Sequence, residues 1–199
     1  MFDREEIDGF FQVFFEHVRL LVDIPPEDQA LCRQYFAPIR VSKGTLLELA
    51  GKVHVYHNFI VSGYMRCYHI DDSGQEVTTD LNDGPRFFTS YHAFANRTPS
   101  NDNLQCLTDC ELLRIKRDDV DITARLGTTQ IDYTVQVLEN ALQKNKQRVI
   151  DMTTRSAEDR YRGLMNDHPA IIQHVPLKYI ASYLGINPGS LSRIRNKMS

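Results

Sequence analysis

The feature that most constrains the fold is an 18-residue run near the end of the printed chain, LKYIASYLGINPGSLSRI at 177–194. Apolar residues recur at helical spacing on both sides of a short turn. Ala181 supplies the small side chain that two short helices need where they cross, and Gly185 supplies the positive φ of a tight turn. Asn187 can cap the second helix and Pro188 fits its first turn. The run therefore predicts a helix-turn-helix.

In a helix-turn-helix the second helix lies in the major groove of DNA. Leu191 and Ile194 are predicted to point inward. Arg193 is the candidate for reading a guanine, because its planar fork matches the two acceptors on that base edge. Ser190 and Ser192 are candidates for contacts with bases or phosphates. The other candidates are basic residues expected to contact phosphates, which position the protein without specifying a sequence: Lys178, Arg195 and Lys197.

The distribution of charge supports this interpretation, although the total does not. The 199 residues carry a formal net charge of −3, which taken whole argues against nucleic-acid binding. Residues 1–139 hold 22 acidic and 13 basic residues, whereas residues 140–199 hold 10 basic and 4 acidic residues, with no acid after Asp167. The alternative is a terminal helical pair that packs on the body of the protein or on a partner, with its bases merely solvated. The acid-free basic segment favours DNA.

The first part of the chain changes from helical to strand-like patterning. Apolar residues at three- and four-residue spacing predict a helix over 7–22, ended by Pro25-Pro26, and a short helix over 27–36. From Pro38 to Lys116, short β-branched and aromatic runs are separated by glycines at roughly ten-residue spacing. This texture predicts an antiparallel sandwich or barrel. The run Asp71-Asp72-Ser73-Gly74 predicts a hairpin turn within it.

A long helix is predicted over 128–152, and its apolar residues form a narrow heptad seam rather than a broad face. The seam consists of Ile131, Val135, Leu138, Leu142, Asn145, Val149 and Met152. A single Asn at a seam position commonly fixes register and oligomeric state. The seam therefore predicts pairing with a second copy of the chain; the alternative is a helix packed on its own sheet.

Composition places these parts in an ordinary globular protein. Hydrophobic residues make up 42% and charged residues 25% of the chain, and no stretch approaches the ~18 apolar residues of a membrane helix. The first residues are acidic, unlike a signal peptide, and the four cysteines are too sparse for a disulfide scaffold. We expect a cytoplasmic α+β protein with a strand-rich domain at 1–126, a dimerisation helix at 127–152 and a DNA-binding domain at 153–199.

The order of these parts resembles the CRP/FNR family of bacterial transcription regulators along the whole chain. The resemblance is carried by Lys43-Gly44, by IVSGYMRCYHIDDSGQEVTTDL at 60–81 and by LSRI at 191–194. It implies that 1–126 is a sensor domain, an antiparallel β-roll or jelly roll of the cyclic-nucleotide-binding type, followed by a long dimerisation helix and a C-terminal winged helix-turn-helix. It also implies a homodimer rather than an enzyme, with double-stranded DNA as partner and RNA polymerase as a further one.

The sequence departs from the family pattern at both functional ends. Pro188-Gly189 stands where the family usually has Arg-Glu, so the usual operator contacts cannot all form. The effector pocket lacks the Gly-Glu pair and the Arg-Ser/Thr-Ala run that hold cyclic AMP. The positions that the resemblance puts there are Phe87, Thr89, Ser90, Ser100, Asn101 and Asp102. We expect no cofactor and no binding of cyclic AMP or cyclic GMP. Another small-molecule effector, or regulation without a ligand, stays open.

Two other classes of function remain as alternatives. The first is a sensor or interaction protein with a degenerate helix-turn-helix, which the Pro188-Gly189 departure keeps open. The second is a metal-dependent jelly-roll enzyme. Against it, Cys106 and Cys110 lack a second ligand pair, no HxH spacing is present, and P-loop, GxSxG, HExxH and EF-hand patterns are all missing. We therefore expect neither a catalytic nor a metal site.

Overall fold

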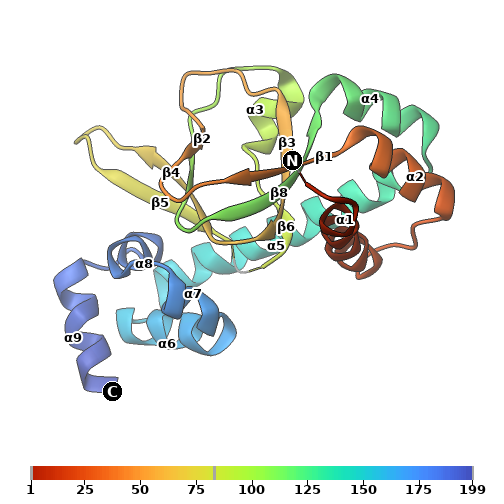
Figure 1. Ribbon diagram of the computed structural model, residues 1–199. Helices are drawn as coiled ribbons and strands as arrows, with labels where there is room; N and C mark the ends of the chain where they lie inside the picture. The colour runs from red at the N-terminus through yellow and green to blue at the C-terminus, as the bar shows by residue number, and fades with distance from the viewer. Residues whose placement is uncertain (1, 83, 199) are drawn as a thin grey trace.

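Two antiparallel four-stranded sheets form a β-roll in the computed structural model, which describes residues 2–82 and 84–198 (Figure 1). The strands of the first sheet, in spatial order, are β1 (Ala37–Val41), β8 (Cys110–Lys116), β3 (Tyr56–Ser62) and β6 (Arg86–Phe87). Those of the second sheet are β2 (Leu46–Glu48), β7 (Asn103–Cys106), β4 (Met65–Ile70) and β5 (Glu76–Leu81). Ile60 and Leu112 of one sheet and Met65 and Leu104 of the other are buried in one cluster, so the sheets enclose a common core.

Helices cover one side of the roll. α1 (Arg4–Arg19) begins with a capping box between Asp3 and Glu6, and α2 (Pro26–Tyr35) begins at a proline. The buried face of α1 is rich in phenylalanine, and its Phe14 ring meets the Phe59 ring of β3 edge-on at 4.9 Å. The shorter α3 (Tyr91–Asn96) and α4 (Arg117–Leu126) follow β6 and β8. The first helices thus close the outer face of the sheet that contains β3.

The long helix α5 (Gln130–Thr154) runs under the roll and continues to the terminal helices (Figure 1). Its start is held by Asp28, whose carboxylate accepts hydrogen bonds from the backbone N–H groups of Thr128 (2.9 Å) and Thr129 (2.7 Å). Tyr133 and Val137 pack into the same cluster as the phenylalanines of α1. The first half of α5 is therefore a fixed part of the roll.

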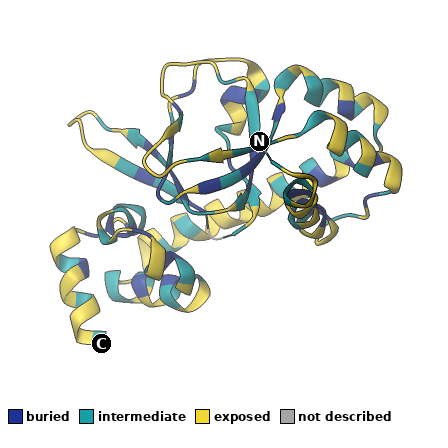
Figure 2. Ribbon diagram, viewed as in Figure 1, coloured by how far each residue is buried: buried dark blue, intermediate teal, exposed yellow. Residues whose placement is uncertain are grey.

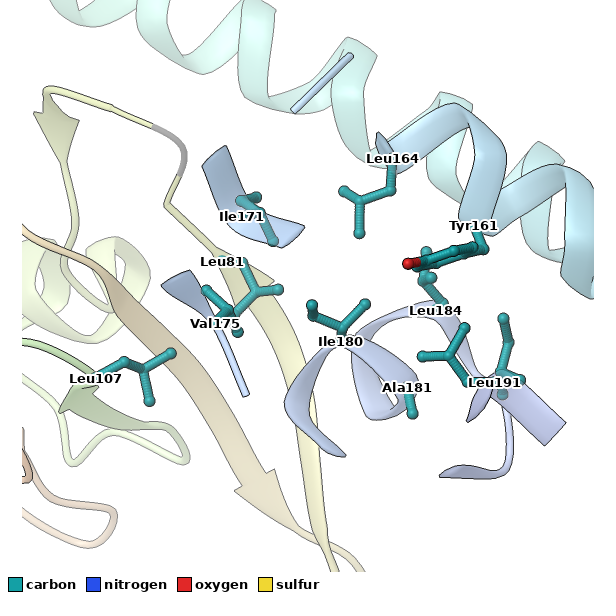
Figure 3. Packing of buried hydrophobic residues seen from close by; sticks show 11 residues of the cluster. Leu81, Leu107, Tyr161, Leu164, Ile171, Val175, Ile180, Ala181, Leu184 and Leu191 are labelled. Carbon is teal, nitrogen blue, oxygen red and sulfur yellow. The ribbon is translucent and has the colours of Figure 1, made fainter. Parts of the chain in front are cut away.

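Four helices complete the described chain: α6 (Ala157–Asp167), α7 (Pro169–His174), α8 (Leu177–Leu184) and α9 (Pro188–Met198). Figure 3 shows side chains from all four converging on one core that Leu81 of β5 and Leu107 of the roll also join. The terminal helices consequently share a core with the second sheet.

The predicted fold class is confirmed, with differences in detail. The helices predicted over 7–22, 27–36, 128–152 and within 177–194 all appear, as do strands between 38 and 116, whereas β6, β7, α3, α4 and α7 were not predicted. Asp71 Oδ1 accepts from the N–H groups of Ser73 and Gln75 and Gly74 has φ +81°, which confirms the hairpin turn. One detail needs correction: residues 155–198 contain helices and no strand, so the β-hairpin wing of the expected winged domain has no counterpart in that range.

Candidate functional site

The helix-turn-helix depends on a turn in which glycine is required. Gly185 ends α8 with φ +62°, and Ile186 N–H donates to Ala181 O at 2.9 Å. A Cβ atom at Gly185 would lie 2.5 Å from the Cε atom of Met152 on α5, but that atom ends a flexible side chain, so the positive φ is the stronger requirement for glycine. Ala181 is fully buried. Both residues have the conformational and packing roles that the sequence predicts.

The helix α9 starts as expected and buries only one of its faces. The side-chain oxygen of Asn187 accepts from Gly189 N–H at 2.9 Å, and Pro188 occupies the first turn. Leu191 is fully buried, and Ile194 packs partly buried against the same core. Five of the predicted DNA-contacting residues are exposed and the sixth, Ser190, is partly buried; the exposed five are Lys178, Ser192, Arg193, Arg195 and Lys197.

Three of these basic residues, all with exposed side chains, make long contacts within the protein. Arg193 Nε donates to Gly189 O within its own helix at 3.4 Å. Lys197 Nζ lies 3.4 Å from a Glu158 carboxylate oxygen, and its side chain is 75% exposed. Lys178 Nζ lies over the Tyr179 ring at 4.7 Å. Because exposed ion pairs contribute little to stability, these side chains can exchange such contacts for phosphates at small cost.

The terminal helices are joined to the roll through α8. Ser182 Oγ accepts a hydrogen bond from Thr78 N–H at 2.8 Å. Arg148 of α5 donates to Thr79 O and to Tyr183 O, both at 3.0 Å. The buried guanidinium of Arg66 on β4 lies 3.7 Å from the Tyr179 ring centroid. The position of the helix-turn-helix is therefore coupled to β4 and β5.

The predicted heptad seam lies on the surface of α5. All seven of its residues are exposed, its apolar members ranging from Met152 at 40% to Leu142 at 72%, and Figure 2 shows the middle of the helix largely exposed. Residues of the same helix that face the roll, such as Tyr133 and Val137, lie outside this seam. An exposed, regularly spaced apolar stripe is the form of a coiled-coil contact.

The predicted effector pocket corresponds to a cavity of about 380 Å³ between the roll and α5. Phe87, Thr89, Ser90 and Asp102 line this cavity. Ser100 and Asn101 are not among its lining residues. Ser100 is buried, its Oγ accepts from Asp102 N–H at 2.9 Å, and Asn101 is exposed. The structure therefore brings together four of the six predicted positions.

One side of this cavity has an acidic residue in its lining, Asp102, and a second acidic residue, Glu48, buried behind Ser90. Asp102 accepts a hydrogen bond from Ser90 Oγ at 2.7 Å. The buried carboxylate of Glu48 accepts from Ser90 N–H at 3.2 Å and from the side-chain amide of Asn58 at 3.3 Å. Burial, aided by the negative charge of Asp102, raises the pKa of Glu48 to about 7. The negative charge of Asp102 disfavours a further negative charge, such as a cyclic phosphate, on this side.

A cation that sequence reasoning missed, Arg86, also lines the cavity. Its guanidinium donates to an Asp80 carboxylate oxygen at 2.7 Å and to Leu81 O at 3.2 Å. Its charge is therefore already balanced within the roll. The only sequence signal for it was its place directly before Phe87, because the family pattern expects the cation further along the chain.

Two other classes of site find no support in the described residues. Residues 2–82 and 84–198 contain no group of three or more His, Cys, Asp or Glu side chains placed to hold a metal ion. Within the same ranges, the helices are all too short or too polar to cross a membrane.

Comparison with known proteins gives a match in fold but not in sequence. No protein-family model and no curated protein matches the chain. Among similar solved structures, FixK2 from Bradyrhizobium japonicum has a TM-score of 0.68 and 13% identity, covering 82% of this chain and 84% of its own. A putative CRP/FNR regulator from Eubacterium rectale has 0.68 and 15%, covering 86% and 82%. The c-di-GMP responsive global regulator CLP from Xanthomonas campestris has 0.65 and 15%, covering 96% and 91%. The chain therefore has the fold of CRP/FNR transcription regulators.

Proposed function

We propose that this chain is a CRP/FNR-type transcription regulator, not an enzyme, that acts as a cytoplasmic homodimer on double-stranded DNA in a bacterium. The observation that carries the proposal is α9, which buries Leu191 and exposes Ser192, Arg193, Arg195 and Lys197 on an acid-free segment. The division of labour follows the predicted boundaries: 1–126 senses, 127–152 pairs the subunits and 153–199 binds DNA.

Dimerisation is supported by the exposed seam of α5. Pairing two copies through Leu138, Leu142 and their neighbours would remove large apolar side chains from water. A twofold axis along α5 places the two copies of α9 on the same side of the dimer. Such a dimer reads a palindrome when its recognition helices are about 34 Å apart, one turn of DNA.

Regulation by cyclic AMP or cyclic GMP does not fit the cavity of the roll. Asp102 makes one side acidic, and the charge of Arg86 is balanced by Asp80. A signal in the roll would reach α9 through the contacts of α8 with β5. A ligand can change the relative position of the two DNA-binding domains only if it binds the two conformations of the dimer with different affinity. Contact with RNA polymerase is part of the proposal, as for an activator of this class.

The deciding experiment selects bound sequences from random DNA with the full chain. We expect a palindrome whose half-sites are about 10 base pairs apart. With three basic residues from each of two subunits on phosphates, affinity should fall about a thousandfold between about 50 and 200 mM salt. Micromolar binding of cyclic AMP in calorimetry would contradict the effector part of the proposal.

A second candidate is a sensor or interaction protein whose helix-turn-helix no longer binds DNA. Pro188 and Gly189 favour it, because they leave the first turn of α9 without the long polar side chains that reach base edges. No enriched sequence, together with salt-independent and weak DNA binding, would favour this candidate over the regulator.

A further inference from the structure

A second cavity, of about 290 Å³, lies outside the cavity of the roll. It is bounded by α1, α2, α4 and the first turns of α5, and its lining is mostly apolar, with Phe14, Val18, Phe94, Ile115 and Ala124 among its residues. Five residues line both cavities and so form the wall between them: His57, Phe87, Tyr91, Tyr133 and Thr134. We call this second space the helix-side cavity.

His57 presents an unpaired polar atom in this wall. Its ring stacks on Phe87 at 4.2 Å and on Phe94 at 5.1 Å. Its Nδ1 atom is buried and has no hydrogen-bond partner in the structure. Burial lowers the pKa of His57 to about 3, so the ring is neutral at physiological pH. A neutral imidazole offers one donor and one acceptor to a suitable partner.

Tyr133 presents a second unpaired atom in the same wall. Its side chain is only 8% exposed, and its hydroxyl is buried without a hydrogen-bond partner. Burial raises the pKa of Tyr133, so the hydroxyl keeps its proton and can both donate and accept. Buried polar atoms are nearly always hydrogen-bonded, which makes two such atoms in one cavity wall a specific signal.

The charges of the helix-side cavity are already compensated, although the buried Nε atom of Arg117 has no hydrogen-bond partner. Asp28 accepts backbone hydrogen bonds from Thr128 and Thr129, and Arg117 pairs with Asp121 at 2.5 Å. An ionic ligand would therefore lose its hydration without gaining a free counter-charge. The aromatic lining and the two unpaired atoms favour instead a neutral ring with one polar group.

We propose that the helix-side cavity binds a small neutral aromatic molecule whose single hydroxyl or N–H group pairs with His57 Nδ1 and the Tyr133 hydroxyl. The ring packs against Phe14, Phe87 and Phe94. Because the cavity touches α4 and the start of α5, the ligand would act on the base of the long helix. The site stands whether or not α9 binds DNA.

The first experiment uses the full chain and N-phenyl-1-naphthylamine, a neutral fluorescent probe with one N–H group. We expect saturable binding to one site per chain, with competition from 2-naphthol and from naphthalene. These two competitors share their rings and differ by one hydroxyl. The hydroxyl should strengthen binding about fivefold, the value of one net hydrogen bond. Equal affinities, or no saturable binding, would overturn the proposal.

Two pairs of variants locate the site. Tyr133→Phe and His57→Phe keep an aromatic ring and should each reduce the preference for 2-naphthol towards one; an unchanged preference in both would overturn the assignment. Ala124→Leu fills the helix-side cavity and should weaken probe binding at least tenfold. Ala141→Leu makes the same change on the wall of the roll cavity and should leave binding unchanged. The reverse result would place the probe in the roll cavity. Circular dichroism checks that each variant folds.

Discussion

The roll cavity and α9 treat their charged residues in opposite ways. In the cavity, Arg86 is paired with Asp80, and Glu48 and Asp102 are both hydrogen-bonded to Ser90. On α9 the basic side chains point to solvent, with contacts such as the 3.4 Å approach of Lys197 to Glu158. The cavity therefore satisfies its charges internally, whereas α9 offers its charges to a partner.

This difference shows how each end departs from the pattern that it resembles. In the roll, the expected ligand-binding charges are replaced by charged groups that pair with one another, although the buried Nε atom of Arg86 has no hydrogen-bond partner. On α9, Pro188 and Gly189 preserve the helix start and the turn but remove long side chains from it. The departure in the roll changes which ligands can bind, whereas the departure on α9 leaves the helix-turn-helix geometry intact. The predictions below test the two regions in turn.

The largest expected effect tests the exposed seam of α5, through which two copies of the chain are proposed to pair. Replacing Leu138 and Leu142 by Asp in both subunits puts four charges at the proposed contact. At about 1.5 kcal/mol per leucine, dimerisation should weaken by about 6 kcal/mol, roughly 10⁴-fold. Analytical ultracentrifugation should then show monomers where the wild type shows dimers.

The control places the same charges on another face of α5. Gln136 and Gln143 are exposed and lie outside the seam. Gln136→Asp with Gln143→Asp should leave the dimer intact. Dimers that persist in the leucine variant would show that α9 is not paired through this helix.

The next effect tests the cost of the acidic network in the roll. The pKa of Glu48 is raised to about 7 from 4.5, so the folded state holds its proton more tightly than the unfolded state. The free-energy cost of ionising Glu48 in the folded protein is absent below the pKa of the unfolded state and complete above the pKa of the folded state. The free energy of unfolding therefore falls as pH rises between these two pKa values. From about pH 5 to 8 the wild type should lose up to about 3 kcal/mol relative to Glu48→Gln.

Urea unfolding at the two pH values measures this difference, because the amide keeps the volume of the side chain but does not titrate. Asp102→Asn tests the same network from the other side: it should lower the pKa of Glu48, because it removes the negative neighbour. Identical pH dependence in the wild type and Glu48→Gln would show that the Glu48 carboxylate does not titrate between those pH values.

The sequence predicts α9 better than the cavity, for a physical reason. Gly185 and Asn187 act through backbone conformation and hydrogen bonds within a few residues, so their roles follow from local spacing. The cavity joins residues far apart in the chain, such as Glu48, Ser90 and Asp102, and no local pattern reports their approach. β6 was missed because its two residues are too few to show alternation.

A smaller effect tests whether the exposed charges of α9 specify a DNA sequence. Arg193→Ala should weaken binding to the selected site by about 2 kcal/mol and relax the preference at one base position. Arg19→Ala removes an exposed arginine from α1, on the roll side, and should change neither. Footprinting and repeated selection measure both quantities. Unchanged affinity and preference for Arg193→Ala would remove the guanine assignment.

The smallest effect compares one glycine from each region. Gly185→Ala should destabilise the protein by about 1 kcal/mol, because φ is +62° and the new Cβ would lie 2.5 Å from Met152 Cε. Gly9→Ala, in the interior of α1 with no atom within 4 Å of its Cβ, should stabilise it by a similar amount. Thermal unfolding measures both changes. Met152→Ala removes the close approach to the new Cβ but not the backbone strain. If Gly185→Ala still destabilises the protein when combined with Met152→Ala, the turn requires glycine for its positive φ rather than for its small size.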